Sequence, residues 1–211
     1  RQKERRLSAE VRVGVFYDDN AAVIPSPIKS QHEPLIPSLR HPKHETLGQL
    51  AGLRGEYVWY RDESWDATVG YSFFTTYNDD LPSFNVMDHL GSLGLTRKLS
   101  IDNMPAQIGV TYAYDALFLR EKIFVQRHTG SLIGALAEDD MNLTQGFFRY
   151  QNKDFTTGSP PPEDRDARNY MFGVLHLLRF QQDKYLLKFG FQKDYEYADG
   201  RDYTYHGERV Q

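Results

Sequence analysis

The chain of 211 residues contains no cysteine, so disulfides and thiolate metal sites are excluded. Long apolar runs are also missing, because the longest, LIGALA at 132–137, has six residues. A membrane-spanning helix needs about 20 consecutive apolar residues, so a helical membrane protein is excluded. Basic charge is not in excess either: the net charge is −4 at pH 7, which offers nucleic acid no attractive field.

Aromatic residues, in contrast, are abundant. The chain has 14 Tyr, 13 Phe and 2 Trp, although its mean hydropathy is only −0.62. Many of them recur at every second position, which is the period of an extended strand whose two faces differ. We predict nine complete strands and the start of a tenth, at 9–23, 47–60, 65–77, 86–99, 106–118, 123–136, 142–155, 169–180, 185–197 and from 203.

The stretch YVWYRDESWDATVGYSF, residues 57–73, raises the question of which face of these strands meets water. In a soluble sheet the apolar face points inward. In a transmembrane β-barrel the pattern is inverted, with an apolar band toward lipid and a polar lumen. Such a barrel scores as hydrophilic as a whole, which fits the low mean hydropathy.

The connections between the predicted strands favour the inverted arrangement. Every second connection is short, with the sequences RDES, SIDNMP, EDDM and QQDK. The connections between these are mostly longer and richer in Pro, Gly and charge. Two of them are of moderate length, LREK and ADGRD. Barrels of the outer membrane have short periplasmic turns and longer external loops, whereas a soluble meander has no reason to sort its loops in this way. We therefore expect the short turns and the N-terminus on the periplasmic side.

Aromatic side chains gather at both ends of the predicted strands, where a bilayer has its interfaces. Trp59, Tyr60 and Trp65 flank one short turn, and Phe180 and Tyr185 flank another. An ordinary β core would place its aromatic residues in the middle of the strands instead. The distribution favours a membrane protein.

The alternation then predicts two sets of residues with opposite surroundings. Facing lipid we expect Trp65, Val69, Tyr71, Phe73, Ile108, Val110, Tyr112, Leu187, Phe189 and Phe191. Lining the lumen we expect Arg54, Glu56, Asp66, Thr68, Gln107, Thr111, Asp115, Gln145, Arg149, Gln151, Lys153, Lys188, Gln192 and Asp194. The polar set could line a passage for a polar solute, or it could fill a narrow barrel and satisfy itself.

The predicted fold is therefore an all-β, antiparallel, up-and-down transmembrane β-barrel of at least ten strands. Because YHGERVQ ends in the middle of a strand, we expect the barrel to be incomplete at its C-terminus. Residues 1–8 are interpreted as the remnant of a periplasmic linker and residues 9–211 as the barrel domain.

Three segments add a resemblance to a known family. VGVFYDDNAAVIP (13–25) resembles a first barrel strand, HTGSLIGALAEDDMNLTQGFFRYQNKDF (128–155) a central hairpin, and KYLLKFGFQKDYEYADGRDYTYHGERV (184–210) a later strand, loop and strand. The similarity is to the C-terminal barrels of tetratricopeptide-repeat outer-membrane proteins, such as surface lipoprotein assembly modifiers and, more distantly, exopolysaccharide-export porins. It implies a Gram-negative outer membrane and a periplasmic repeat domain as a partner.

Candidate catalytic and metal sites in the sequence have simpler interpretations. HPKH at 41–44 spaces two imidazoles as a metal site does, but it lies among prolines, so we prefer a solvated loop. His128 and Ser131 fall on opposite faces of a regular strand and cannot meet. His176 is unexpected among apolar residues, and either it pairs with a neighbouring strand or the register slips there. The tip GSPPPEDRD is expected to be solvated.

These observations predict a conduit or assembly platform for the export of a polar substrate or surface protein. We expect no enzymatic activity and no cofactor, metal or nucleic acid, and as partners the lipid bilayer and a surface protein or polysaccharide. Two alternatives stay open: a structural barrel with a plugged lumen that anchors a partner, and a soluble barrel that binds a small apolar ligand with its aromatic face inward.

Overall fold

The computed structural model describes residues 6–19, 45–156, 164–180, 184–200 and 203–210. These residues form ten strands and one short 3-10 helix, η2 (Pro82–Phe84). The strands are β1 (Leu7–Asp18), β2 (Thr46–Arg61), β3 (Trp65–Asn78), β4 (Val86–Ile101), β5 (Met104–Leu119), β6 (Lys122–Ala137), β7 (Asn142–Phe155), β8 (Ala167–Phe180), β9 (Tyr185–Ala198) and β10 (Tyr205–Val210). The described part of the chain holds no helix of the length and apolar character that a membrane crossing requires.

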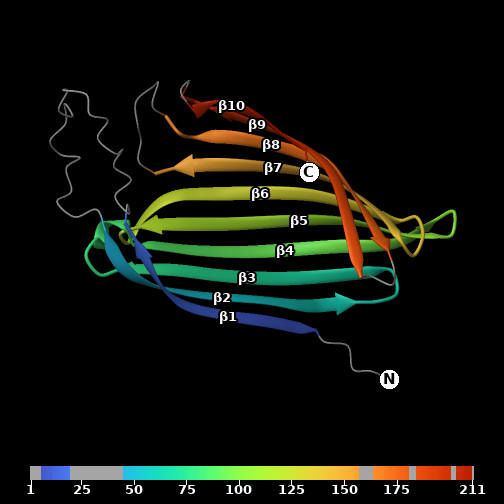
Figure 1. The fold of residues 1–211 in the computed structure, drawn as a ribbon, viewed down its shortest axis with the longest axis horizontal. Coiled ribbons are helices and arrows are strands. Elements are labelled where there is room, and N and C mark those ends of the chain that lie inside the picture. The colour runs from blue at the N-terminus through green and yellow to red at the C-terminus, as the bar shows by residue number, and fades with distance from the viewer. Residues whose placement is uncertain (1–5, 20–44, 157–163, 181–183, 201–202, 211) are drawn as a thin grey trace.

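All ten strands belong to one sheet, in which each strand pairs with its neighbour in the chain. Every pairing is antiparallel. The predicted all-β, antiparallel, up-and-down class is thus confirmed. Figure 1 shows the sheet as a single curved layer with β1 along one border and β10 along the other. Among the described residues β1 pairs only with β2 and β10 only with β9, which leaves two sheet edges.

The strands are staggered along the sheet. One hydrogen-bonded row joins Val69 on β3, Tyr112 on β5 and Tyr195 on β9. Counted from the first residue of each strand, these positions lie 4 (69 − 65), 8 (112 − 104) and 10 (195 − 185) residues from the short-turn end. The strands therefore shift in one direction, as they do where strands tilt around a barrel axis.

Two turns at the short-turn end are held by aspartate side chains. The carboxylate of Asp62 accepts the backbone N–H of Ser64 at 2.7 Å and of Trp65 at 2.6 Å. Asp139 does the same four strands further on, with Met141 and Asn142 at 2.7 Å each. The hydrogen bond from Tyr60 is the largest influence that lowers the pKa of Asp62, and the side-chain amide of Asn142 has that role for Asp139.

Two hairpins have turns of only two residues. Asp102 and Asn103 join β4 to β5, and Arg120 and Glu121 join β5 to β6. All four residues have positive φ, between 49° and 65°, which matches the twist of paired strands. The β5–β6 link was predicted to be of moderate length, and this prediction was wrong. It is as tight as β4–β5, although it lies at the end of the sheet that carries the longer loops.

The sheet buries few apolar side chains. Those below a tenth exposed are Val58, Ala67, Leu81, Ala116, Val125 and Ala167. A sheet of a soluble protein normally packs one face against a second layer. In the described part of this chain no second layer is present. Both faces of the sheet are therefore candidate functional surfaces.

Candidate functional site: the two faces of the sheet

Register and alternation assign the strand residues to two faces. Successive side chains of a strand point to opposite faces, and residues paired across strands share a face. One row therefore defines a face from β1 to β10: Leu7, Tyr57, Val69, Leu93, Tyr112, Gly130, Tyr150, Tyr170, Tyr195 and His206. We call this the apolar face and the opposite one the polar face. Bulges near Val58 and Leu117 shift the alternation only at strand ends.

The apolar face is open to its surroundings. Val69 is 40% exposed, Tyr71 45%, Phe189 53% and Phe191 45%. Burying such side chains from water stabilises a protein by about 1.5–3 kcal/mol each, so leaving a whole face of them in water is unfavourable. The described residues of the chain do not cover this face.

The register separates the two predicted sets completely. All ten residues predicted to face lipid, such as Val110 and Tyr112, lie on the apolar face. All fourteen predicted to line a lumen, such as Thr111 and Lys188, lie on the polar face. Their contact with lipid and with a lumen stays a prediction.

A hydrogen-bonded cluster on β7, β8 and β9 organises one part of the polar face. Its centre is Asn169, which is 1% exposed. The Asn169 amide donates to Asp194 at 2.7 Å and to Glu196 at 3.2 Å, and it accepts from Arg149 at 3.2 Å. Lys153 forms an ion pair with Glu196. Sequence reasoning missed Asn169, although its position out of phase with Tyr170 would have placed it on the polar face.

A second cluster joins β4, β5 and β6 near the long-loop end. Arg127 Nε lies 2.6 Å from a carboxylate oxygen of Asp115, and its Nη2 lies 3.9 Å from Asp88. Asp115 is only 6% exposed, so this pair is shielded from solvent. In both clusters cations pair with carboxylates or amides, although Arg149 Nε and Asp88 Oδ1 are buried without a hydrogen-bond partner among the described residues.

The basic stretch LTRKLS at 95–100 is explained by the same alternation. Lys98 lies on the polar face and its Nζ reaches Asp66 at 3.0 Å, where Arg61 also binds at 2.8 Å. Arg97 lies on the apolar face, with its guanidinium 5.4 Å from the ring centroid of Trp65. Neighbouring cations in the sequence thus stabilise opposite faces of the sheet.

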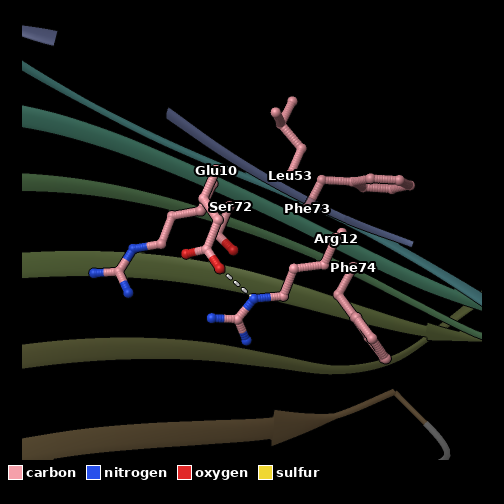
Figure 2. Close-up of a pocket in the computed structure, with 8 residues that line it drawn as sticks. Glu10, Arg12, Leu53, Ser72, Phe73 and Phe74 are labelled. Carbon is pink, nitrogen blue, oxygen red and sulfur yellow. Dashed lines mark hydrogen bonds and ion pairs between the residues drawn. The ribbon is translucent and has the colours of Figure 1, made fainter. Parts of the chain in front are cut away.

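On β1 to β3 the polar face contains an open hollow of about 210 Å³. Gly52 leaves the space, and Arg12, Arg54 and Phe74 are among the residues around it. Figure 2 shows the guanidinium of Arg12 bonded to the carboxylate of Glu10 in front of the strands. This hollow lies next to the free edge of β1.

Four histidines on the apolar face contact neighbouring strands. Tyr71 and His89 are joined by a hydrogen bond of 2.7 Å, and so are Tyr112 and His128. His206 lies edge-on to the ring of Tyr195 at 5.1 Å. The unexpected His176 pairs with Thr144 of β7, with Nδ1 2.8 Å from the hydroxyl, and the register does not slip there.

These contacts do not assemble a nucleophile, a base and an orienting acid. His128 lies on the apolar face and Ser131 on the polar face. Thr144 does lie between His176 and Glu138, whose carboxylate is 2.6 Å from the Thr144 hydroxyl. In a catalytic triad the acid instead binds the ring nitrogen that the nucleophile leaves free. Here Glu138 is 3.9 Å from the same Nδ1 that Thr144 contacts.

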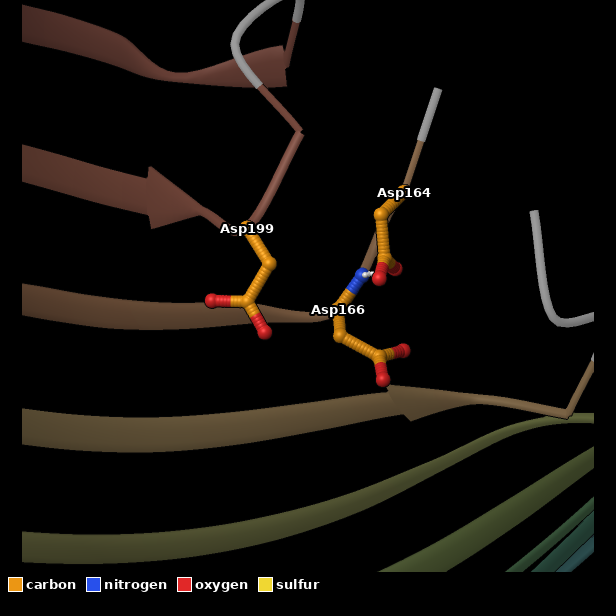
Figure 3. A group of neighbouring side chains, drawn as sticks. All are labelled: Asp164, Asp166 and Asp199. Carbon is orange, nitrogen blue, oxygen red and sulfur yellow. Dashed lines mark hydrogen bonds between the residues drawn. The ribbon is translucent and has the colours of Figure 1, made fainter. Parts of the chain in front are cut away.

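A group of three carboxylates lies at the long-loop end of β8 and β9. Figure 3 shows Asp164 and Asp166 before β8 and Asp199 after β9. Their oxygens are within 4.8 Å of one another. Two of the carboxylates already accept backbone N–H groups, Asp166 from Phe155 at 2.6 Å and Asp164 from Asp166 at 3.1 Å. These bonds give the group a structural role in holding the loop ends. The HPKH motif lies outside the described residues.

Comparison with known proteins adds no assignment: no family model, no curated protein and no solved structure matches the chain. The class of the protein therefore follows from its own geometry. Its described residues form a ten-stranded antiparallel meander with one apolar and one polar face.

Proposed function

We propose that the ten strands form the wall of a transmembrane β-barrel in a bacterial outer membrane, with the apolar face toward lipid and the polar face enclosed. The barrel acts as a conduit or assembly platform that exports a polar substrate or a surface protein. The polypeptide has no catalytic chemistry and no cofactor in this role. The observation that carries the proposal is the inverted burial, because aliphatic and aromatic side chains are exposed while Asp115 and Asn169 are buried.

The exposed apolar area argues for a lipid environment. Soluble monomers rarely expose an apolar patch larger than a few hundred Å², whereas here exposed Val, Leu, Phe and Tyr side chains extend over the described strands. Hydrocarbon would cover this face without a second layer of protein.

The aromatic residues near the short turns also support a position of the sheet in a membrane. Trp59 is 59% exposed and Tyr185 61%. Rings at this position mark the water interface of a barrel, with aliphatic residues such as Val110 between the two interfaces. The assignment of the short turns to the periplasmic side is based on loop length, because aromatic belts form at both interfaces.

Closure of the sheet is part of the proposal. Strand edges cannot be left unpaired in hydrocarbon, because each free N–H and C=O costs several kcal/mol. The curvature in Figure 1 and the one-directional stagger are the features expected of a sheet that closes. Additional strands or direct pairing would then cover β1 and β10.

The resemblance to tetratricopeptide-repeat barrels suggests the partners. On this proposal a periplasmic repeat domain delivers the substrate, which is a surface protein or a polysaccharide. The second candidate is a structural barrel that anchors such a partner. The cluster around Asn169 favours it, since side chains that bond mainly to one another can fill a lumen without binding a substrate.

Cysteine labelling tests the orientation of the two faces, and the absence of native cysteine gives a clean background. Val110→Cys and Thr111→Cys are adjacent residues on opposite faces. In intact outer membranes we expect a charged, water-soluble maleimide to label Thr111→Cys and to leave Val110→Cys unlabelled until the protein is denatured. The unboiled protein should also migrate differently from the boiled one on a denaturing gel.

Recovery of the protein in the aqueous fraction without detergent would refute the membrane barrel and favour the soluble ligand-binding alternative, in which Val110 points inward and also stays unlabelled. Fast labelling of Val110→Cys would contradict both arrangements. Conductance across a planar bilayer then separates the two membrane candidates. An open channel supports the conduit, and a closed barrel that copurifies with a surface component supports the anchor.

A further inference from the structure

Most cations of the polar face have a partner in the described residues. Lys98 binds Asp66, Arg127 binds Asp115, and Lys153 binds Glu196. Lys188 on β9 and Arg209 on β10 differ, because their side chains are exposed and make no ion pair or hydrogen bond within the described ranges. The two unneutralised charges lie on neighbouring strands.

Both cations line one hollow, of about 120 Å³, which we call the β9–β10 hollow. Gly190 and Gln192 also line it, and Phe147 and Leu175 provide apolar walls. A water molecule occupies about 30 Å³ in the liquid, so the hollow has room for a group the size of a carboxylate or phosphate. No carboxylate lines it.

The acidic residues nearest along the strand are already engaged. Asp194, two residues after Gln192 and on the same face, accepts the amide of Asn169 at 2.7 Å. The Gln192 amide donates to Met171 Sδ at 2.8 Å, which holds this side chain at the hollow. A second N–H of the same amide stays available to a ligand. The local charge therefore favours an anion from outside the chain.

We infer that the β9–β10 hollow binds an oxyanion, a carboxylate or phosphate group carried by the exported substrate. Charge-assisted hydrogen bonds from Lys188 and Arg209 supply the attraction, and the apolar walls strengthen it by excluding water. Lys188 is three residues from Tyr185 at the short-turn end (188 − 185). The inference rests on the proposed function, in which this end is the periplasmic entrance.

Modification of Gln192→Cys by small thiol reagents of opposite charge tests the hollow directly. We expect the anionic methanethiosulfonate to react about tenfold faster than the cationic one of similar size, because two nearby positive charges concentrate anions. Inorganic phosphate at millimolar concentration should slow the anionic reagent. In Lys188→Gln/Arg209→Gln the preference and the effect of phosphate should both disappear.

Gln107→Cys is the matched control. Gln107 is the same residue type on the polar face, opposite Lys98, whose charge is paired with Asp66. It should show little preference between the two reagents, and the double substitution should leave its reactivity unchanged. Heat-modifiable mobility on a gel verifies that each variant is folded.

Two further outcomes separate this inference from the proposed function. If Gln192→Cys reacts equally with both reagents and phosphate has no effect, the hollow is not an anion site, but a water-accessible polar face is upheld. If the folded protein in membranes reacts with neither reagent at Gln192→Cys or Gln107→Cys, the open lumen itself is refuted, and the inference with it.

Discussion

Asn169 illustrates how single residues organise the polar face. Its amide is buried, yet both of its polar atoms are hydrogen-bonded. The same bonds hold Asp194 and Glu196, two like charges on one face of β9, close to a common donor. A buried polar network is stabilising when all its members are satisfied and costly when one is removed.

Replacing Asn169 by leucine should therefore destabilise the protein. Asp194 and Glu196 each lose a hydrogen-bond donor and keep one other partner, Tyr205 for Asp194 and Lys153 for Glu196, so we expect a loss of about 1–3 kcal/mol in the free energy of unfolding. Urea titration of the protein refolded into lipid vesicles measures it. Asn152→Leu is the control, because Asn152 lies on the apolar face of β7 and its side chain has no hydrogen bond to a described residue. Equal losses in the two variants would contradict a structural role for the cluster.

The hairpins illustrate the scale of the element. Arg120 and Glu121 adopt left-handed backbone conformations, with φ of 49° and 64°. Such conformations cost side chains other than Gly, Asn and Asp about 1–2 kcal/mol per residue. The β4–β5 turn has Asp102 and Asn103 at the equivalent positions. Asp and Asn tolerate a positive φ better than Arg and Glu do. The flanking strands thus impose the geometry of the β5–β6 turn, although Arg120 and Glu121 disfavour a positive φ.

Substitution of Arg120→Asn and Glu121→Gly together should stabilise the fold by about 1 kcal/mol, because the new residues accept positive φ without strain. The midpoint of urea unfolding measures the gain. Asp102→Asn with Asn103→Gly should give a clearly smaller gain. Arg120→Ala/Glu121→Ala should give none, since alanine keeps the steric conflict, and a gain there would contradict the argument from backbone strain.

At the scale of the whole sheet, the described residues form a single curved layer whose apolar side chains lie on the face opposite its polar networks. Among the described residues no second layer covers either face, which is unfavourable for the apolar side chains in water. A bilayer outside and an enclosed polar interior satisfy both faces at once. On the proposed function, the effect of a polar substitution on folding stability therefore depends on the face that carries it, and this dependence is measured in a lipid bilayer.

Substitution by arginine on each face tests whether the apolar face lies in lipid. Val110→Arg, on the apolar face, should cost about 2–4 kcal/mol of folding stability in lipid vesicles, whereas Thr111→Arg on the polar face should cost little. In water an exposed Val110, at 56%, would tolerate the change to within about 0.5 kcal/mol. Equal tolerance at both positions would count against the lipid-facing assignment.

Strand positions could be predicted from sequence because alternation is a local property. The predicted strand 142–155 coincides with β7, and 86–99 differs from β4 only by two residues at its end. The first strand was predicted at 9–23 and is observed at Leu7–Asp18, with residues 20–23 outside the described part. The connection between β5 and β6 was predicted but its two-residue turn was not, because Arg and Glu carry no turn signal and the flanking strands impose its geometry.

The partners on the polar face could not be predicted in the same way. Alternation placed Arg149 and Lys153 on one face, but it could not show that Lys153 meets Glu196, 43 residues away. Nor could it show that Asn169 lies between Arg149 and Asp194, because these contacts depend on the register of three strands. Register is set by turn lengths and bulges. A shift of one residue in register would change every cross-strand pair between the two strands.

By itself, the order of residues determined that this chain is extended, that its strands follow one another as a meander, and that each has one greasy and one hydrophilic side, since all three depend on near neighbours in the chain. The folded arrangement decided which charges form ion pairs and which, like Lys188 and Arg209, have no such partner among the described residues. That decision is made between strands, where stagger, bulges and turn length set the contacts, and no local pattern records them.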